Sequence, residues 1–269
     1  MTVRSSNILL AAVLAALLIL AYLVETTIPQ VTLVSIRSPR LKSFFSGRVV
    51  AQISDQHLVK FGWRDQLVVS ALEKIHPNII FMTGDYLEPR TDFADLEKYL
   101  RKLRAVAPIV AIPGNNDYCC IKRLDTLFSR CGIAFLKNQT ALLHSEYDSL
   151  YVVGLEDNFL WQDDYFQAAA AVPSGASRIV LGHAPAIVEK IDSDGVELIL
   201  AGHLHGGQII LPFYGPVARN TVCFVSRMYT AGVYQFNGMT LYSNRGTGTS
   251  LVPLRFLSRP EVAVFEFTD

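Results

Sequence analysis

The sequence predicts an α/β fold, because short buried strands and amphipathic helices alternate along much of the chain. The 269 residues are 51% hydrophobic and only 18% charged, so the chain can bury an extensive core and is not intrinsically disordered. Lys and Arg together number 24, and Asp and Glu together also number 24. This balance gives no support for a general nucleic-acid binder.

The first element is an apolar segment at residues 8–24 that contains no charged side chain. Its length is at the short end of what crosses a bilayer as a helix. A cleaved signal peptide and a buried helix of the soluble domain are alternatives, but the run is long for the former and apolar on every face. We expect an uncleaved transmembrane anchor at residues 1–24, a connector at 25–43 and a globular domain at 44–269.

The orientation of this anchor is predicted from the charges beside it. More Lys and Arg follow the segment than precede it, which favours a cytoplasmic domain at a bacterial inner membrane. A positively charged N-terminus argues the other way. The four cysteines, at positions 119, 120, 131 and 223, have no disulfide or zinc-finger spacing, and we expect buried thiols in a reducing compartment.

Five apolar runs rich in Val, Ile or Leu are typical of strands buried on both faces of a sheet. They are residues 49–53, 78–82, 108–112, 178–181 and 196–200. Apolar side chains recur on one helical face at residues 67–75, 93–103 and 121–131, and residues 133–153 fit a hairpin. This order implies βαβ units and a parallel or mixed sheet.

Each predicted strand is followed by a loop that carries a metal-ligating side chain. The motifs are Asp55-x-His57, Gly84-Asp85, Gly114-Asn115-x-Asp117, Gly182-His183 and Gly202-His203-x-His205. Loops at the carboxyl ends of strands build the sites of open α/β sheets. The chain has only six His residues, and four of them stand in these motifs, so we expect one metal centre.

In these motifs and in their order, residues 44–269 resemble the calcineurin-like metallophosphoesterases. The run Gly202-His203-Leu204-His205-Gly206-Gly207-Gln208 and the tail with Arg245, Arg255 and Arg259 are similar to a branch of membrane-associated or exported bacterial phosphodiesterases. The resemblance implies an αββα sandwich of two mixed β-sheets flanked by helices. Residues 222–267 would then contribute to the second sheet, with a hairpin around Gly238.

The resemblance also implies a set of ligands for two divalent metal ions. Asp55, His57 and His205 would bind the first ion, Asn115, His183 and His203 the second, and Asp85 would bridge them. Imidazole and carboxylate ligands suit Mn, Fe or Zn better than Mg or Ca, and we expect Mn²⁺. Two such ions bind a hydroxide and clamp a phosphate for in-line attack.

Asn116 and Asp117 are the expected catalytic residues beside this centre. The family commonly has Gly-Asn-His-Asp or Gly-Asn-His-Glu here, whereas this chain has Asn116 in place of the His. An amide cannot act as a general acid, so the departure favours a leaving group that needs no proton, such as a phosphate. Alternatively, another residue supplies the acid, or Asn116 only positions the phosphate.

The remaining candidate polar residues have plainer interpretations. We expect His76 and His144 to be solvated, and Asp157 to be either a loop carboxylate or a group behind the ligands. Arg245 and Arg255 could contact the substrate phosphate or be surface charges.

The predicted function is that of a membrane-anchored two-metal phosphohydrolase. Its substrate is either a lipid-linked nucleotide diphosphate, such as UDP-2,3-diacylglucosamine in lipid A synthesis, or a soluble or cell-envelope phosphodiester met by an exported enzyme. Phe44 and Phe45, and the apolar residues 251–257, could contact lipid or belong to the core. A non-catalytic metal-binding module is the alternative from another class. The oligomeric state is not predicted.

Overall fold

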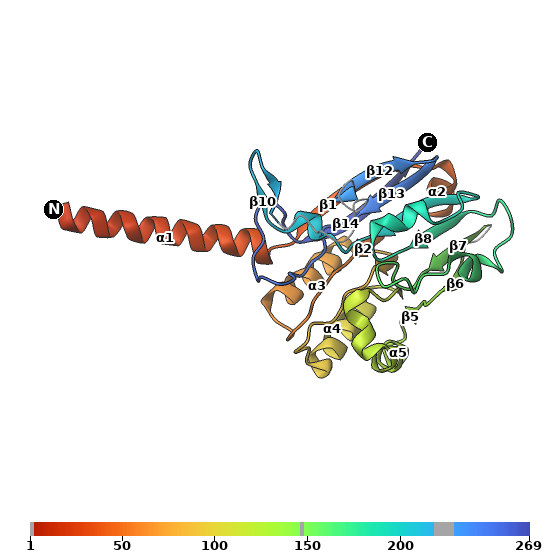
Figure 1. Cartoon of the computed structure of the whole chain (residues 1–269), viewed down its shortest axis with the longest axis horizontal. Helices are drawn as coiled ribbons and strands as arrows, with labels where there is room; N and C mark the ends of the chain where they lie inside the picture. Colours follow the sequence, from red (N-terminus) through yellow and green to blue (C-terminus); the bar gives the residue numbers. More distant parts are fainter. Residues whose placement is uncertain (1–2, 146–147, 218–228) are drawn as a thin grey trace.

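The computed structural model of the chain describes residues 3–145, 148–217 and 229–269. Helix α1 (Val3–Thr27) projects from the body, and two six-stranded β-sheets with helices on their outer faces make up most of the rest (Figure 1). Within the described residues, no helix combines the length and the apolar character needed to cross a membrane. The expected transmembrane helix at residues 8–24 is therefore not supported.

The first sheet has six strands in the order β1-β14-β2-β3-β4-β5. Strand β2 runs antiparallel to β14, whereas the other neighbours are parallel. The strands are β1 (Gln30–Arg37), β14 (Glu261–Thr268), β2 (Val50–Ile53), β3 (Ile79–Met82), β4 (Ile109–Ala111) and β5 (Ala134–Phe135).

The second sheet also has six strands, in the order β12-β13-β9-β8-β7-β6. Its four central strands are parallel, and β12 and β6 run antiparallel at the edges. The strands are β12 (Gly232–Phe236), β13 (Met239–Ser243), β9 (Val196–Ala201), β8 (Arg178–Leu181), β7 (Ser149–Gly154) and β6 (Gln139–His144). The expected hairpins around Gly238 and within residues 133–153 are confirmed by the β12–β13 and β6–β7 pairs.

The two sheets pack face to face through side chains such as Phe81, Leu181, Leu200 and Phe265. A second core lies between the first sheet and three helices, and a third lies under the short helices on the second sheet. These helices are α3 (Trp63–Ile75), α4 (Phe93–Val106), α5 (Ile121–Arg130), α6 (Tyr165–Ala169) and the 3₁₀ helix η2 (Pro185–Glu189). The chain thus has the expected α/β architecture with two mixed sheets.

The segment predicted as a connector, residues 25–43, is part of the folded body. It contains β1 and most of helix α2 (Pro39–Phe44), so the body begins at Gln30 rather than at residue 44. Phe44 and Phe45 are buried in the core between the sheets, which excludes them as lipid contacts. Strand β14 belongs to the first sheet rather than to the second, where residues 222–267 were expected.

The loops that follow β2, β3, β4, β8 and β9 meet at one end of the sandwich. The Asp55 amide donates to Gly84 O across the first sheet, and the Gly202 amide donates to His183 O across the second. Gln52 links the two sheets, because its Nε2 donates to Ala201 O and to Thr83 Oγ1 at 3.0 Å each. Side chains on these loops therefore converge.

Candidate metal centre

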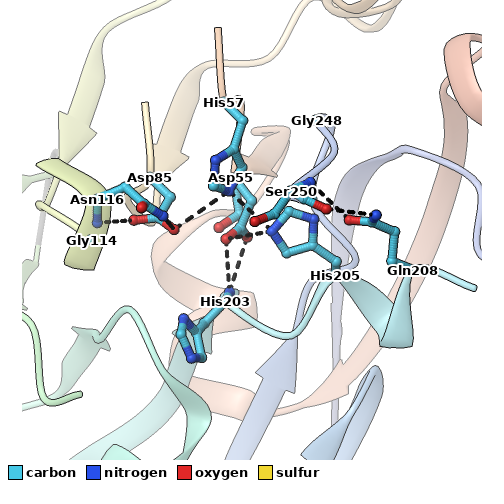
Figure 2. Close-up of polar contacts among 12 residues, drawn as sticks. Asp55, His57, Asp85, Gly114, Asn116, His203, His205, Gln208, Gly248 and Ser250 are labelled. Carbon is cyan, nitrogen blue, oxygen red and sulfur yellow. Dashed lines mark hydrogen bonds and ion pairs between the residues drawn. The ribbon is translucent and has the colours of Figure 1, made fainter. Parts of the chain in front are cut away.

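Three of the predicted ligands form one cluster on the loops after β2 and β9. Asp55, His57 and His205 each present a donor atom, and all three atoms lie within 4.8 Å of one another. His57 Nε2 is 3.1 Å from His205 Nε2, and His205 Nε2 is 3.5 Å from Asp55 Oδ1 (Figure 2). All three side chains are buried.

A second cluster consists of Asp85, His183 and His203, whose donor atoms also lie within 4.8 Å of one another. His203 Nδ1 is 3.2 Å from His183 Nε2. Asn115 joins this group at the start of the 3₁₀ helix η1 (Asn115–Cys120), where its Oδ1 is 3.2 Å from the same His183 nitrogen.

Asp85 connects the two clusters through its two carboxylate oxygens. Oδ2 lies 3.4 Å from His57 Nε2, and Oδ1 lies 3.4 Å from His183 Nε2. One carboxylate therefore faces a nitrogen from each cluster, as the bridging ligand of a two-metal centre does.

The donor atoms suit divalent cations. His57 Nε2 and His205 Nε2 face each other at 3.1 Å, and two neutral imidazoles placed in this way can each offer a lone pair to a cation. Thr83 O lies 2.7 Å from His183 Nδ1, which holds the proton there and leaves Nε2 to ligate. Histidine and carboxylate donors suit Mn, Fe or Zn.

The backbone of these loops is held in an uncommon conformation. Asp55, His57, Asp85, His203 and His205 all have positive φ values, between 44° and 69°. Non-glycine residues rarely adopt this region, and such strain concentrates at functional sites. Five of the seven candidate ligands thus share this conformation, whereas Asn115 and His183 do not.

The charge states of the histidines also favour metal binding. Burial, together with His183, lowers the pKa of His203 to about 3, and burial and His57 hold the pKa of His205 well below its usual value. Burial opposes charge on His183 too, but Asp85 and Asp55 outweigh it and raise its pKa well above the usual value. His203 and His205 are therefore neutral at pH 7 and ready to ligate. Burial opposes charge on His57 as well, but Glu88, Asp85 and Asp55 outweigh it, so that the pKa of His57, like that of His183, is raised, and a metal would displace the added proton.

The sequence profile of the calcineurin-like phosphoesterases matches residues 48–207, which contain all seven candidate ligands. The chain belongs to the calcineurin-like phosphoesterases.

Curated relatives of this calcineurin-like phosphoesterase agree with the assignment. The metallophosphoesterase YkuE of Bacillus subtilis is 32% identical over 240 residues, which are 86% of this chain and 82% of the relative. The phosphodiesterase YaeI of Escherichia coli is 31% identical over 71% of this chain and 70% of its own. The UDP-2,3-diacylglucosamine pyrophosphatase LpxG of Chlamydia trachomatis is 25% identical over 89% of each. The chain is a metal-dependent phosphoesterase.

Within the phosphoesterase site, Asn116 and Asp117 differ in what they contact. Asn116 Nδ2 donates to Asp85 Oδ2 at 2.6 Å, and its backbone amide donates to Asp85 Oδ1 at 2.8 Å (Figure 2). Asp117 is fully buried, and its two oxygens accept from the amides of Gly114, Asp85, Tyr86 and Leu87. Asp117 therefore holds the backbone of the loop at Asp85, and the catalytic role expected for it stays a prediction.

Glu88 is a neighbour of the phosphoesterase ligands that the sequence interpretation missed. Its Oε1 lies 2.8 Å from His57 Nδ1, on the side away from the cluster, where a carboxylate orients a ligating histidine. The available signal was a carboxylate three positions after Asp85.

Arg255 is neither a surface charge nor a contact of the substrate phosphate, the two roles considered for it from the sequence. It is fully buried, and its guanidinium donates to the carbonyls of His205, Arg245, Gly248 and Ser258. It therefore fixes the His205 loop and does not reach substrate. Arg245 is paired with Glu261 at 2.9 Å.

The other three candidates lie outside the ligand set of the phosphoesterase. Asp157 is buried, and its Oδ1 has no partner among the described residues. His76 and His144 are exposed, as expected. Of the cysteines, Cys131 is buried and Cys119 is exposed, whereas Cys223 lies outside the described residues.

Proposed function

We propose that this phosphoesterase hydrolyses the diphosphate bond of a lipid-linked nucleotide, such as UDP-2,3-diacylglucosamine, with two Mn²⁺ ions held by the seven ligands. The observation that carries the proposal is Asn116. It occupies the position beside Asp85 where the family commonly has a histidine, and it offers an amide that cannot transfer a proton.

Bound in the two clusters, divalent cations would supply a hydroxide nucleophile and neutralise the phosphate charge. Asp55, His57 and His205 hold the first ion, Asn115, His183 and His203 the second, and Asp85 both. Asn116 restrains Asp85 through two hydrogen bonds. Asp117, Glu88 and Arg255 keep these side chains in place from behind.

Neither the described histidines nor Tyr118 offers a replacement acid beside Asn116. His76 and His144 are exposed elsewhere, and the other four histidines belong to the clusters. Tyr118 follows on the same helix, but burial raises its pKa well above the usual value, and its hydroxyl is engaged with Glu156 and the Asp157 amide. A phosphate leaving group departs as a stable anion without a proton, whereas an alkoxide requires one. The named activity of LpxG supports the same class of substrate.

The test compares wild type with Asn116→His on diesters and diphosphates graded by the pKa of the leaving group. General acid catalysis contributes about 10²–10⁴-fold, so we expect wild type to lose rate steeply as the leaving group becomes more basic. The histidine variant should show a flatter dependence. Equally shallow dependences in both proteins would remove the basis of the proposal.

A soluble or cell-envelope phosphodiester is the second candidate substrate, and the similarity to the phosphodiesterase YaeI favours it. Turnover of a panel containing diesters, monoesters and nucleotide-diphosphate lipids, with added Mn²⁺, separates the two. A preference for simple diesters would select this second candidate. Bound metal without any turnover would select a non-catalytic metal-binding module.

Attachment to the cytoplasmic face of a bacterial inner membrane through residues 8–24 belongs to the same proposal. Its support is the uncharged apolar run and the excess of basic residues that follows it. Carbonate extraction of the membrane fraction tests the attachment. Protease protection of the domain tests its orientation. Recovery of the full chain in the soluble fraction would contradict it.

A further inference from the structure

An unusually apolar surface surrounds the inner end of α1. Several large side chains there are exposed, including Leu251 at 98% and Phe213, which is fully exposed. They come from the hairpin of β10 (Ile210–Leu211) and β11 (Gly215–Pro216) and from the segment between β13 and β14. We call these residues the apolar collar: Phe213, Tyr214, Leu251, Val252, Leu254 and Leu257.

The collar is one surface, because hydrogen bonds join its two segments. The Ile210 amide donates to Phe256 O, and the Phe256 amide donates to Gln208 O. Gln208 Nε2 donates to Ser250 O at 2.9 Å and to Val252 O at 3.0 Å. Figure 1 shows both segments beside the inner end of α1.

Helix α1 is hydrogen-bonded to the collar segment. Tyr22 Oη donates to Pro253 O at 3.0 Å, the Leu257 amide donates to Glu25 Oε2 at 2.7 Å, and the Arg255 amide donates to Thr26 Oγ1 at 3.1 Å. The collar is therefore fixed against the helix whose sequence carries the uncharged run at residues 8–24. On the projecting part of this helix, Ile19 and Leu20 are 61% and 57% exposed.

Beside the collar lies a groove of about 240 Å³ that has mixed polarity. Tyr22 and Thr26 of α1, Trp63 and Arg64 of α3 and the neighbouring Lys60 line it. Trp63 is 70% exposed. Tyr and Trp beside cations, at the border of an apolar surface, are typical of side chains at the level of lipid headgroups.

The collar also adjoins the metal centre. Gln208 follows His205 by three residues, and Arg255, between Leu254 and Leu257, holds the His205 carbonyl. The Gly248 amide, which precedes Leu251, donates to Asp55 O at 2.7 Å, and Figure 2 shows Gly248, Ser250 and Gln208 next to His205. A binding partner that contacts the collar would therefore lie on the His205 side of the metal centre.

We propose that the apolar collar docks on a phospholipid bilayer and holds the metal centre at the lipid surface. Contiguous exposed apolar side chains mark sites that something covers. The occupant here is lipid, because the collar continues the apolar run of α1 and is bordered by the Tyr, Trp, Lys and Arg side chains of a headgroup-facing rim. The proposal deepens the proposed lipid-linked substrate and rests on it only for the substrate class.

The test uses the full chain with one tryptophan as a fluorescent reporter. Trp63 and Trp161 are the two tryptophans of the chain, and both are replaced by Phe. Phe213→Trp then reports on the collar, and Phe166→Trp, on the exposed side of α6 where Phe166 is 71% exposed, is the matched control. Emission is recorded with vesicles of phosphatidylethanolamine and phosphatidylglycerol that contain bromine-labelled phosphatidylcholine.

We expect the Phe213→Trp reporter to shift to shorter wavelength and to be quenched by the brominated lipid, and the Phe166→Trp reporter to do neither. Equal quenching of both reporters, or none at position 213, would overturn the proposal. A concentration-dependent shift at position 213 without vesicles would overturn it in favour of a second copy of the chain.

A second variant separates docking from catalysis. Phe213→Asp with Leu251→Asp should weaken vesicle association of the collar by about tenfold or more, because each buried side chain of this size contributes that much to transfer from water. Hydrolysis of soluble bis-p-nitrophenyl phosphate should be unchanged. If the double variant still docks on vesicles, the collar proposal fails whatever the substrate. If wild type docks but does not cleave diphosphate lipids, only the proposed substrate fails.

Discussion

Asp85 shows how much one side chain contributes to this site. Its two oxygens face nitrogens from different sheets, and Asn116 fixes both of them with hydrogen bonds. Asp55 also contacts both clusters, but it reaches the second only through the backbone amide of His203. A neutral amide at this position would present a donor to one cluster and would carry no charge to hold two cations together.

We predict that Asp85→Asn abolishes Mn²⁺-dependent hydrolysis of bis-p-nitrophenyl phosphate. The loss should exceed the roughly 10–100-fold that follows removal of groups behind metal ligands. Elemental analysis and initial rates check this. Asp95→Asn on α4 is the control, and it should keep both the bound metal and the rate of hydrolysis. Full activity of the Asp85 variant with two metals per chain would sink the assignment of the site.

Metal binding should release a proton from His183. In the metal-free chain Asp85 and Asp55, acting against burial, raise the pKa of His183 well above its usual value, so the imidazole is charged at pH 7. A ligating imidazole must be neutral, and Mn²⁺ affinity should therefore fall as the pH falls and rise as it approaches the raised pKa. Calorimetric Mn²⁺ titrations at pH 7 in buffers of different ionisation enthalpy measure the released proton; a heat independent of the buffer would contradict the prediction.

At the scale of the elements, the ligand loops are packed against one another at glycines. A Cβ on Gly114 would lie 2.7 Å from His183 Cε1 and closer still to Asp85. We predict that Gly114→Ala lowers the free energy of unfolding by about 1–3 kcal/mol through overpacking and reduces the bound metal. Thermal unfolding and elemental analysis check both effects.

Gly62→Ala is the matched control for this substitution. Gly62 is extended (φ −130°), and the nearest atoms to an added Cβ are 3.8 Å away. It precedes α3, where Ala is a weaker cap, so a change within about 1 kcal/mol is expected. Equal destabilisation by the two substitutions would show that close packing at Gly114 is not the cause.

The elements differ in how well the sequence predicts them, for physical reasons. Strands β2, β3, β4, β8 and β9 are almost entirely buried, so each is rich in Val, Ile or Leu, although three of them include a polar residue, Gln52, Arg178 or Glu197. Strand β1 alternates between buried side chains, such as Val34 and Ile36, and exposed ones, such as Leu33. Its polar residues made the sequence of this segment look like that of a connector. Its partner β14 lies at the opposite end of the chain, where no local pattern indicates the pairing.

The residues of the functional site also differ in how well the sequence predicts them. The ligands were predictable because each follows a strand in a short motif. The roles of Asp117, Glu88 and Arg255 depend on contacts across loops that sequence spacing does not encode. Arg255 looked like a surface cation, yet it donates to four backbone carbonyls in the interior.

At the scale of the whole molecule, α1 is joined to the body by its last two turns, through Tyr22, Glu25 and Thr26. We predict that deletion of residues 1–24 keeps the metal centre, because Glu25 and Thr26 retain their bonds to Leu257 and Arg255. Hydrolysis of bis-p-nitrophenyl phosphate should persist, while any membrane attachment through residues 8–24 is lost. Rates and fractionation check the two effects.

Deletion of residues 1–28 is the companion variant. It leaves the Arg255 and Leu257 amides without these acceptors and should lower the free energy of unfolding by about 1–3 kcal/mol relative to the shorter deletion. Denaturant unfolding of both proteins measures the difference. Loss of all diester hydrolysis in the shorter deletion would contradict the independence of helix and site.

The pairing of β1 with β14 also determines when the first sheet can be completed during synthesis. All eight residues of β1 are in register with β14, which in turn separates β1 from β2. While the ribosome still holds the C-terminal residues, β1 has no neighbour and the adjoining edge of β2 is open. Unpaired strand edges invite association with other chains. The nascent protein therefore carries this liability until residues 261–268 have been made, and a truncation before Glu261 would leave it permanently exposed.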